Sequence, residues 1–315
     1  MFLSIIFNSI CSYLITFFFI PIFKRNLWVS FPNERTSHRG ITPVGGAIGF
    51  ISITTLDYIF NKDFAILLFL VLAITGLIDD LKKLSTKFRL IIQSLIGLFY
   101  SFLILNNSIF SYLLINDYSW IISLLIIVFM AFFFVATINF TNFSDGLDGL
   151  LTGSMIVIFL VANYLNIFDF SPLIGGLIGF LFLNWYPSKV FMGDAGSYFL
   201  GSLYFSAIFL SDSLLNSLVL LIIGFPIYGD VMICVIRRYL NNQDITRPHK
   251  LHLFQRLNQK GLNHAQVSFL YISTILLLSI SFILGNLVSL LLCSVLVFGF
   301  GIFLDRFIAA PFIND

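Results

Sequence analysis

Charged residues are scarce in this sequence. They make up 10% of its 315 residues, whereas soluble domains carry about 25%. Hydrophobic residues make up 59%, the mean hydropathy is +1.00, and apolar runs recur along the whole chain. Runs of roughly 15–23 residues match the thickness of a bilayer core, so they exclude a soluble globular protein. The net charge of +2 also provides no basic footprint for a nucleic acid.

Cysteine is almost absent. The three cysteines, Cys11, Cys234 and Cys293, are far apart inside apolar runs. Their number is odd and no CxxC spacing occurs, so neither a disulfide framework nor a zinc site is expected. All three are expected to act as small buried hydrophobic side chains.

The breaks between the apolar runs predict an all-α, polytopic membrane bundle of about eleven transmembrane helices. Residues 1–315 are expected to form a single membrane-embedded domain, because no linker separates a second one. The first run lacks a basic N-terminal region and a small-residue cleavage site, which favours an uncleaved span over a signal peptide. The predicted spans are 1–23, 43–60, 64–79, 88–105, 119–138, 150–165, 171–185, 196–211, 215–236, 265–284 and 287–304.

The distribution of basic residues predicts the orientation of the bundle. With the N-terminus outside and alternating spans, all of the 17 Lys and Arg residues except Lys62 lie in or beside cytoplasmic segments. The C-terminus is then cytoplasmic. The outward-facing segments hold single acidic residues, which are expected to be solvated without a functional role.

An acidic pair, Asp79-Asp80, ends the third predicted span. Adjacent carboxylates at a membrane boundary suit Mg²⁺, which prefers oxygen ligands and usually keeps several waters. A plain interfacial cluster, in which Asp79 pairs with Lys83 four residues later, is the alternative.

Polar side chains recur every third residue in a later segment: Asn139, Asn142, Asp145 and Asp148. On a helix these four positions share one broad face, and Gly146 and Gly149 would let a ligand approach the backbone closely. A pair of Asp-Gly turns in an ordinary loop is the alternative.

A third group combines Asn184 with the sequence Phe-Met-Gly-Asp-Ala-Gly-Ser at 191–197. Gly193 and Gly196 flank Asp194, and the next predicted span begins there. A helix N-terminus beside a metal-binding carboxylate is a favourable place for a phosphate. A simple turn is the alternative.

Two hydrophilic segments, 32–46 and 237–264, hold the remaining candidates. Arg39, His249 and His252 lie in them among basic side chains that could hold a pyrophosphate or anchor the loops to anionic lipid headgroups. Because the predicted topology brings all four groups to the cytoplasmic side, together they favour a Mg²⁺-dependent phosphotransfer site.

In combination these motifs resemble those of the polyprenyl-phosphate N-acetylhexosamine-1-phosphate transferases (glycosyltransferase family 4), from about Pro32 to Arg256. The matching stretches are Pro-Asn-Glu-Arg at 32–35 with Thr-Pro and Gly-Gly within 42–46, the Asp-Asp pair with Lys83, the Asn-x-x-Asn-x-x-Asp-Gly-x-Asp-Gly-Leu run, and Phe-Met-Gly-Asp-x-Gly-Ser. The resemblance implies an O-antigen-initiating transferase of the inner membrane with its active site on the cytoplasmic side.

The resemblance also implies roles for single residues. Asp194 is the expected ligand of Mg²⁺, for which Mn²⁺ could substitute, and the expected catalytic residues are Asp79, Asp80 and Asp145. The residues implied around the nucleotide and sugar are Lys83, Asn142, Asp148, Asn184, Phe191, Arg39, His249 and His252. Phe191 is expected to stack on the uracil.

The implied reaction transfers an N-acetylamino-sugar 1-phosphate from a UDP-sugar to undecaprenyl phosphate and releases UMP. The last cytoplasmic loop departs from many relatives, which carry His-x-His-His where this chain has only His252, with His249 three residues earlier. This form resembles transferases that use UDP-N-acetylfucosamine or UDP-N-acetylquinovosamine, so the donor stays open between these 6-deoxy sugars and UDP-GlcNAc. It argues against the peptidoglycan branch.

An ion-coupled secondary transporter is the alternative function. It is disfavoured because the acids lie at span ends on one side and no internal repeat is evident. The sequence does not fix the oligomeric state, and a homodimer is compatible with it.

Overall fold

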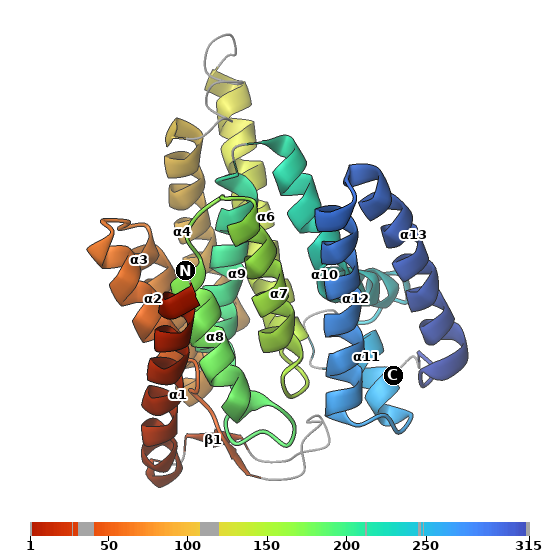
Figure 1. Ribbon diagram of the computed structural model, residues 1–315, viewed down its shortest axis with the longest axis horizontal. Coiled ribbons are helices and arrows are strands. Elements are labelled where there is room, and N and C mark those ends of the chain that lie inside the picture. The colour runs from red at the N-terminus through yellow and green to blue at the C-terminus, as the bar shows by residue number, and fades with distance from the viewer. Residues whose placement is uncertain are drawn as a thin grey trace.

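The computed structural model describes residues 2–26, 28–30, 41–107, 120–211, 213–244, 247 and 249–312. Most of them lie in helices, which run roughly along one direction as a bundle (Figure 1), and the predicted all-α class is confirmed. One short antiparallel hairpin joins β1 (Val29–Ser30) to β2 (Thr42–Pro43). The helices are α1 (Phe2–Arg25), α2 (Ile48–Phe60), α3 (Ile66–Lys82), α4 (Thr86–Asn107), α6 (Trp120–Ser144), α7 (Leu150–Tyr164), α8 (Ser171–Asn184), α9 (Gly193–Phe209), α10 (Leu214–Leu240), α11 (Leu253–Gln259), α12 (His264–Leu284) and α13 (Leu287–Phe303), followed by a π-helical turn η1 (Leu304–Ile308).

Each of the predicted spans overlaps one of these helices. In the described part of the chain, six helices are long and apolar enough to cross a membrane: α1, α4, α6, α10, α12 and α13 extended through η1. Helices α2, α7 and α8 have 13, 15 and 14 residues, fewer than the roughly 20 that a straight span needs. The number of crossings and the orientation of the termini therefore stay predictions.

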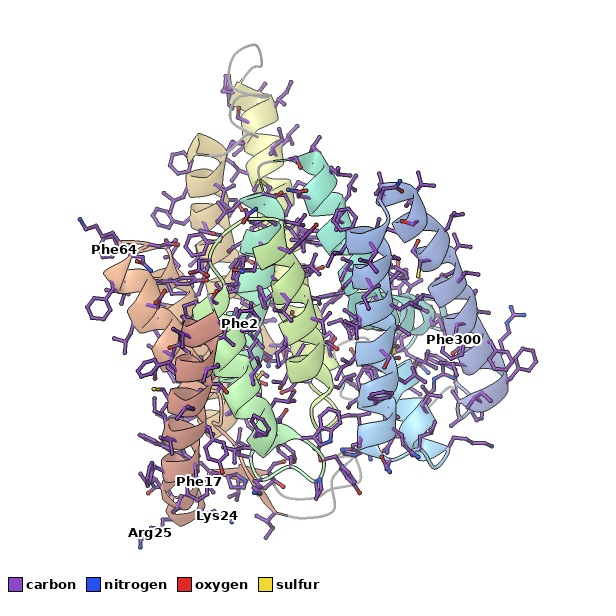
Figure 2. The ribbon with its side chains drawn as sticks, in the orientation of Figure 1. Phe2, Phe17, Lys24, Arg25, Phe64 and Phe300 are labelled. Carbon is purple, nitrogen blue, oxygen red and sulfur yellow. The ribbon has the colours of Figure 1, made fainter. Side chains whose placement is uncertain are left out.

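The outer surface of the bundle is apolar. Phe2, Phe17 and Phe64 project from it (Figure 2) and are 80%, 47% and 60% exposed. Ser12 and Thr16 of α1 are instead buried, and their hydroxyls donate to backbone carbonyls of other segments. Lipid can cover an apolar surface, whereas polar groups inside a bilayer must find partners within the protein. This arrangement is that of a multi-pass membrane protein.

Helix α9 lies in the core of the bundle. Its residues from Ala195 to Ile208 are all buried, and α3 and α6 pack against it. Just before α9 begins, Phe191 N–H donates to the carbonyl of Pro43 at 2.8 Å, and Gly46 N–H donates to the carbonyl of Phe191 at 2.9 Å. The segment after β2 therefore runs beside the start of α9, and two motifs that are distant in the sequence meet there.

Candidate active site

Two glycines let α3 and the start of α9 approach each other. A Cβ on Gly76 of α3 would lie 2.5 Å from the carbonyl carbon of Asp194, so this approach requires glycine. Gly193 has a φ of +77°, and the carboxylate of Asp80 occupies the space that its Cβ would need. As a result, the N–H of Asp194 donates to Asp80 Oδ2 at 2.9 Å. This contact joins the Asp-Asp motif to the Phe-Met-Gly-Asp motif.

Arg89, in the first turn of α4, lies between two of the carboxylates. Its Nη1 is 2.6 Å from Asp79 Oδ2 and 3.7 Å from Asp194 Oδ2, and it also donates to the hydroxyl of Tyr198 at 3.3 Å. The other oxygen of Asp79 accepts the N–H of Leu84 at 2.7 Å. Asp79 therefore fixes the turn between α3 and α4 and holds the guanidinium beside Asp194.

Asn142, near the end of α6, brings a third motif to this site. Its Nδ2 donates to Asp194 Oδ1 at 2.7 Å and to Ser197 Oγ at 3.0 Å. Asn139, one turn earlier, faces α4 instead, because its Nδ2 donates to Gln93 Oε1 at 2.7 Å. Asn142 thus holds the side chain of Asp194, while Asp80 holds its backbone N–H.

Helix α6 ends at Ser144, and residues 145–149 form a turn before α7. The predicted single helical face is therefore wrong beyond that point, because the backbone leaves the helix after Ser144 and Gly149, just before α7, has a φ of +74°. Asp145 lies in this turn and is partly buried. Burial, with the charges of Asp194 and Asp148, raises the pKa of Asp145 to about 7. We call Asp79, Asp80, Asp145 and Asp194 the carboxylate cluster.

Asp148 and Asn184 are buried and held by protein partners. Asp148 Oδ2 accepts the N–H of Ser188 at 3.2 Å and lies 3.4 Å from Nδ1 of His264. Asn184 Oδ1 accepts the N–H of Gly149 at 3.2 Å. Both side chains therefore fix the turn that carries Asp145, and their predicted contacts with a nucleotide stay predictions.

Phe191 and Lys83, which are also predicted around the nucleotide, are more exposed than Asp148 and Asn184. Phe191 is partly exposed beside the start of α9. Lys83 is exposed and ends α3, with a φ of +50° and an N–H that donates to the carbonyl of Asp79. Because the carboxylate of Asp79 pairs with Arg89, the alternative Asp79–Lys83 pair is wrong. Arg39 lies outside the described residues.

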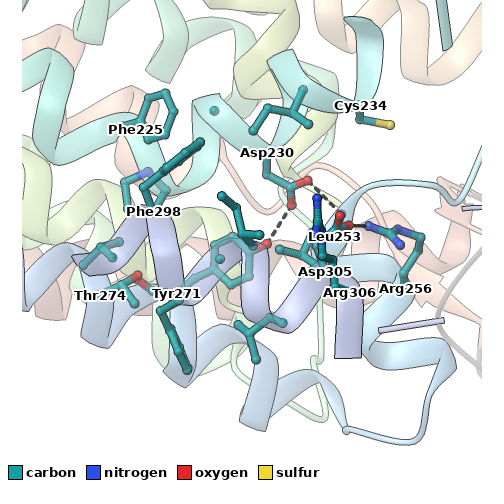
Figure 3. A pocket seen from close by; sticks show the side chains of 18 of the residues that line it. Phe225, Asp230, Cys234, Leu253, Arg256, Tyr271, Thr274, Phe298, Asp305 and Arg306 are labelled. Atoms are coloured by element: carbon teal, nitrogen blue, oxygen red, sulfur yellow. Dashed lines mark hydrogen bonds and ion pairs between the residues drawn. The ribbon is translucent and has the colours of Figure 1, made fainter. Parts of the chain in front are cut away.

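The histidine segment, residues 249–259, is docked on α10. Asp230 of α10 accepts the N–H groups of Leu253 at 2.7 Å and Phe254 at 3.1 Å, and the hydroxyl of Tyr271 at 2.7 Å (Figure 3). The first N–H groups of a helix lack partners within it, so the carboxylate completes the start of α11. The ring of Phe254 then occupies the space beside Gly146, where a Cβ would lie 2.7 Å from it. The histidine segment therefore packs on the turn that carries Asp145.

His252 is the more deeply buried of the two histidines in this segment. It is 3% exposed, and burial together with the charge of Arg238 lowers the pKa of His252 to about 3. Its ring stacks on Phe254, with centroids 5.2 Å apart, and lies 4.8 Å from the ring of His249 and 6.4 Å from that of Phe143. His252 is therefore a neutral, packed side chain in this structure.

Sequence reasoning missed Arg89 and Asp230 as parts of the site. Arg89 was counted only among the basic residues that predict orientation. Its position at the start of the span that follows the Asp-Asp pair was the available signal. Asp230 is an ionisable residue inside the predicted span 215–236, and an acid within a span usually has a functional partner.

The carboxylate cluster is suited to a divalent cation. Among the described residues, the guanidinium of Arg89 pairs with two of its four carboxyl groups, those of Asp79 and Asp194, so negative charge remains in excess when all four are ionised. Carboxylate and amide oxygens, as on Asp80, Asp194 and Asn142, are the ligands that Mg²⁺ prefers. The donors present therefore fit Mg²⁺.

Acids, a cation and an amide gathered at the ends of membrane helices are an arrangement suited to a membrane-embedded enzyme that handles phosphate groups. A sequence model of glycosyl transferase family 4 matches residues 64–212, the stretch that contains the carboxylate cluster and Asn142.

Similar proteins agree with that match. The chain is 30% identical over 289 residues to the probable undecaprenyl-phosphate N-acetylglucosaminyl 1-phosphate transferase of Bacillus subtilis, covering 83% of this chain and 79% of the relative. It is 30% identical over 257 residues to the undecaprenyl-phosphate alpha-N-acetylglucosaminyl 1-phosphate transferase of Thermotoga maritima (79% and 80%). It is 31% identical over 327 residues to the phospho-N-acetylmuramoyl-pentapeptide-transferase of Prochlorococcus marinus (91% and 86%). The chain belongs to glycosyl transferase family 4 and is a transferase, as its motifs predicted.

Proposed function

We propose that this chain transfers an N-acetylamino-sugar 1-phosphate from a UDP-sugar to undecaprenyl phosphate and releases UMP. The observation that carries the proposal is the contact of three motifs at Asp194. Its backbone N–H donates to Asp80, and its carboxylate accepts from Asn142 and lies 3.7 Å from Arg89. The acceptor named for the relatives from Bacillus subtilis and Thermotoga maritima supports undecaprenyl phosphate here.

In the proposed reaction an oxygen of the lipid phosphate attacks the β-phosphorus of the UDP-sugar. The bond between that phosphorus and the bridging oxygen breaks, UMP leaves with both electrons of the bond, and a lipid-linked sugar diphosphate forms. A phosphate monoester is largely ionised near neutral pH, so little proton transfer is needed. Catalysis then depends on positioning and on charge stabilisation.

Two anionic substrates repel each other, so the site must supply positive charge. Mg²⁺ held by Asp194 and Asp80 would neutralise the charge that develops on the pyrophosphate oxygens. Arg89 adds a fixed positive charge beside Asp194, and Asn142 keeps the Asp194 carboxylate oriented. Asp145, whose pKa is about 7, is suited to take the proton from lipid phosphate that arrives singly protonated.

The proposed setting is the inner membrane, with the site on the cytoplasmic side. The basic residues Lys24 and Arg25 end α1 at the bottom of Figure 2, and Lys82 ends α3 directly after the Asp-Asp pair. This distribution supports the orientation because basic residues concentrate on the cytoplasmic side of membrane proteins.

The proposed donor is UDP-GlcNAc or a 6-deoxy relative, UDP-N-acetylfucosamine or UDP-N-acetylquinovosamine. The His249-x-x-His252 pattern supports the 6-deoxy sugars. Because relatives also include phospho-N-acetylmuramoyl-pentapeptide-transferases, UDP-N-acetylmuramoyl-pentapeptide belongs in the same comparison and is expected to be rejected.

The test measures UMP release by the purified chain in lipid nanodiscs with each of these four donors. Turnover should require both undecaprenyl phosphate and Mg²⁺, and Asp194→Asn should lower it by about 10³-fold or more. Asp57→Asn is the matched control, because Asp57 lies near the end of α2 remote from the hairpin and bonds to Asn61. UMP release without the lipid, or full activity of Asp194→Asn, would contradict the proposal.

A further inference from the structure

Three side chains with metal-binding atoms meet where the histidine segment docks on α10. In the described part of the chain, one ligand atom from each of Cys234, His249 and His252 lies within 4.8 Å of the other two. The carboxylate cluster contributes none of these atoms. Cys234 and His252 are buried and His249 is partly buried, so the three atoms are largely shielded from solvent.

His252 supplies an independent sign of a ligand. Its Nδ1 is buried without a hydrogen-bond partner, although buried polar atoms are nearly always paired. His249 Nδ1 accepts the N–H of Leu251 at 3.2 Å, so a metal ion bound through this nitrogen would replace that hydrogen bond. A metal ion would use both imidazoles and would remove the unpaired polar atom.

The fold explains why these residues converge. Cys234 follows Asp230 by one turn of α10 (Figure 3), and Asp230 already holds the first N–H groups of α11. The chain just before α11 is thereby brought onto the next turn of α10. A bound ion would join the same two elements at a second point.

We propose that Cys234, His249 and His252 bind one Zn²⁺, which fastens the histidine segment to α10. A thiolate with two imidazoles is a ligand set that Zn²⁺ favours over Mg²⁺. Tetrahedral Zn–S and Zn–N bonds place ligand atoms about 3.5 Å apart, so the side chains close in on binding. The thiol proton of Cys234 passes to solvent as the Zn–S bond forms. A water molecule or a substrate atom completes the coordination. This metal site is inferred from the three ligand atoms alone, whichever UDP-sugar the chain uses.

The test measures metal content of the full chain, purified in nanodiscs with a tag that contains no histidine, after incubation with Zn²⁺ and dialysis. Wild type should retain roughly one zinc per chain. Cys234→Ser and His252→Gln should each retain less than about 0.1. Cys293→Ser, which changes a cysteine of α13, is the matched control and should retain the metal. Asp194→Asn should also retain it, which separates this site from the carboxylate cluster.

A second measurement uses the unaltered chain, so it does not depend on how well a variant folds. Replacement of Zn²⁺ by Co²⁺ should produce a thiolate-to-cobalt charge-transfer band, and added Zn²⁺ should abolish it. Removal of the metal should also speed amide hydrogen exchange in residues 249–259. Adventitious zinc only, seen as metal lost on dialysis or retained by Cys234→Ser, would overturn the proposal, as would absence of the charge-transfer band.

Discussion

The carboxylate cluster and the histidine segment meet at the turn that carries Asp145 and Gly146, yet they are built differently. Asp80, Asp194 and Asn142 come from α3, α9 and α6, and both Asp80 and Asn142 bond directly to Asp194. They are only partly buried, so their oxygens remain within reach of a substrate. His252 is buried, packed on aromatic rings and neutral.

The difference indicates which group performs the chemistry and which positions it. The carboxylate cluster combines excess negative charge, one guanidinium and hard oxygen donors, as a phosphotransfer site that holds a metal requires. The histidine segment is fixed by Asp230 and supports the turn that carries Asp145 through Phe254. Variants in the two regions should therefore differ in how strongly they change turnover and how strongly they change stability.

The largest effect is expected for Asp80→Asn. The amide oxygen can still accept the N–H of Asp194, so the fold should persist, but a negative charge beside the proposed metal is lost. We expect turnover to fall about 10³-fold with little change in thermal stability, measured by UMP release and by a melting curve in detergent. An equally large loss of stability would mean that Asp80 is mainly a structural residue.

The next effect is expected for Arg89→Ala, which removes the cation between Asp79 and Asp194. Turnover should fall about 10²-fold, and the Mg²⁺ concentration for half-maximal activity should change because the cluster becomes more negative. Arg89→Lys restores the charge without the second guanidinium nitrogen and should recover part of the loss. Equal activity of the Lys and Ala variants would contradict a role for the charge.

Much of this site could be predicted from the sequence, because its motifs sit at the ends of apolar runs. The end of a run marks the membrane boundary, so Asp79, Asp80 and Asp194 were placed together by topology alone, and the structure brings them together. The contact between α3 and α9 that joins them depends on the glycines at positions 76 and 193, where there is no room for a side chain.

The rest depends on contacts that no local pattern encodes. Asn139 and Asn142 are one turn apart, yet one bonds Gln93 and the other Asp194, because α6 packs between α4 and α9. The meeting of Cys234 with two histidines likewise follows from the docking of α11 by Asp230, whereas sequence spacing argued against a zinc site. Helix length also does not fix the number of membrane crossings, because α2, α7 and α8 are shorter than a straight span.

A smaller effect on turnover but a larger one on stability is expected for Asp230→Ala. It leaves two N–H groups of α11 and the hydroxyl of Tyr271 without their acceptor. We expect a loss of roughly 3 kcal/mol in stability, because each buried unpaired group costs about 1–3 kcal/mol. Turnover should fall roughly tenfold as the support of Asp145 loosens. Tyr271→Phe removes one donor only and should cost less on both measures; unchanged melting of Asp230→Ala would contradict the docking role.

The smallest effect concerns pH, and it separates the two regions without a large structural change. The pKa of Asp145 is about 7 in the folded chain, above the value of about 3.9 in an unfolded chain. The folded state then holds the proton more tightly, so the stabilisation is complete below about pH 4 and is lost as pH rises through about 7. The melting temperature in EDTA should therefore fall over this window.

Asp145→Asn, which resembles the protonated acid, should flatten the profile, whereas the control Asp169→Asn should not. His252→Gln should make this fall steeper, because the pKa of His252 is about 3 in the folded chain and about 6.5 in an unfolded chain, so His252 adds stability as pH rises and opposes Asp145. A fall in melting temperature that His252→Gln abolishes would contradict the assignment of this titration to Asp145.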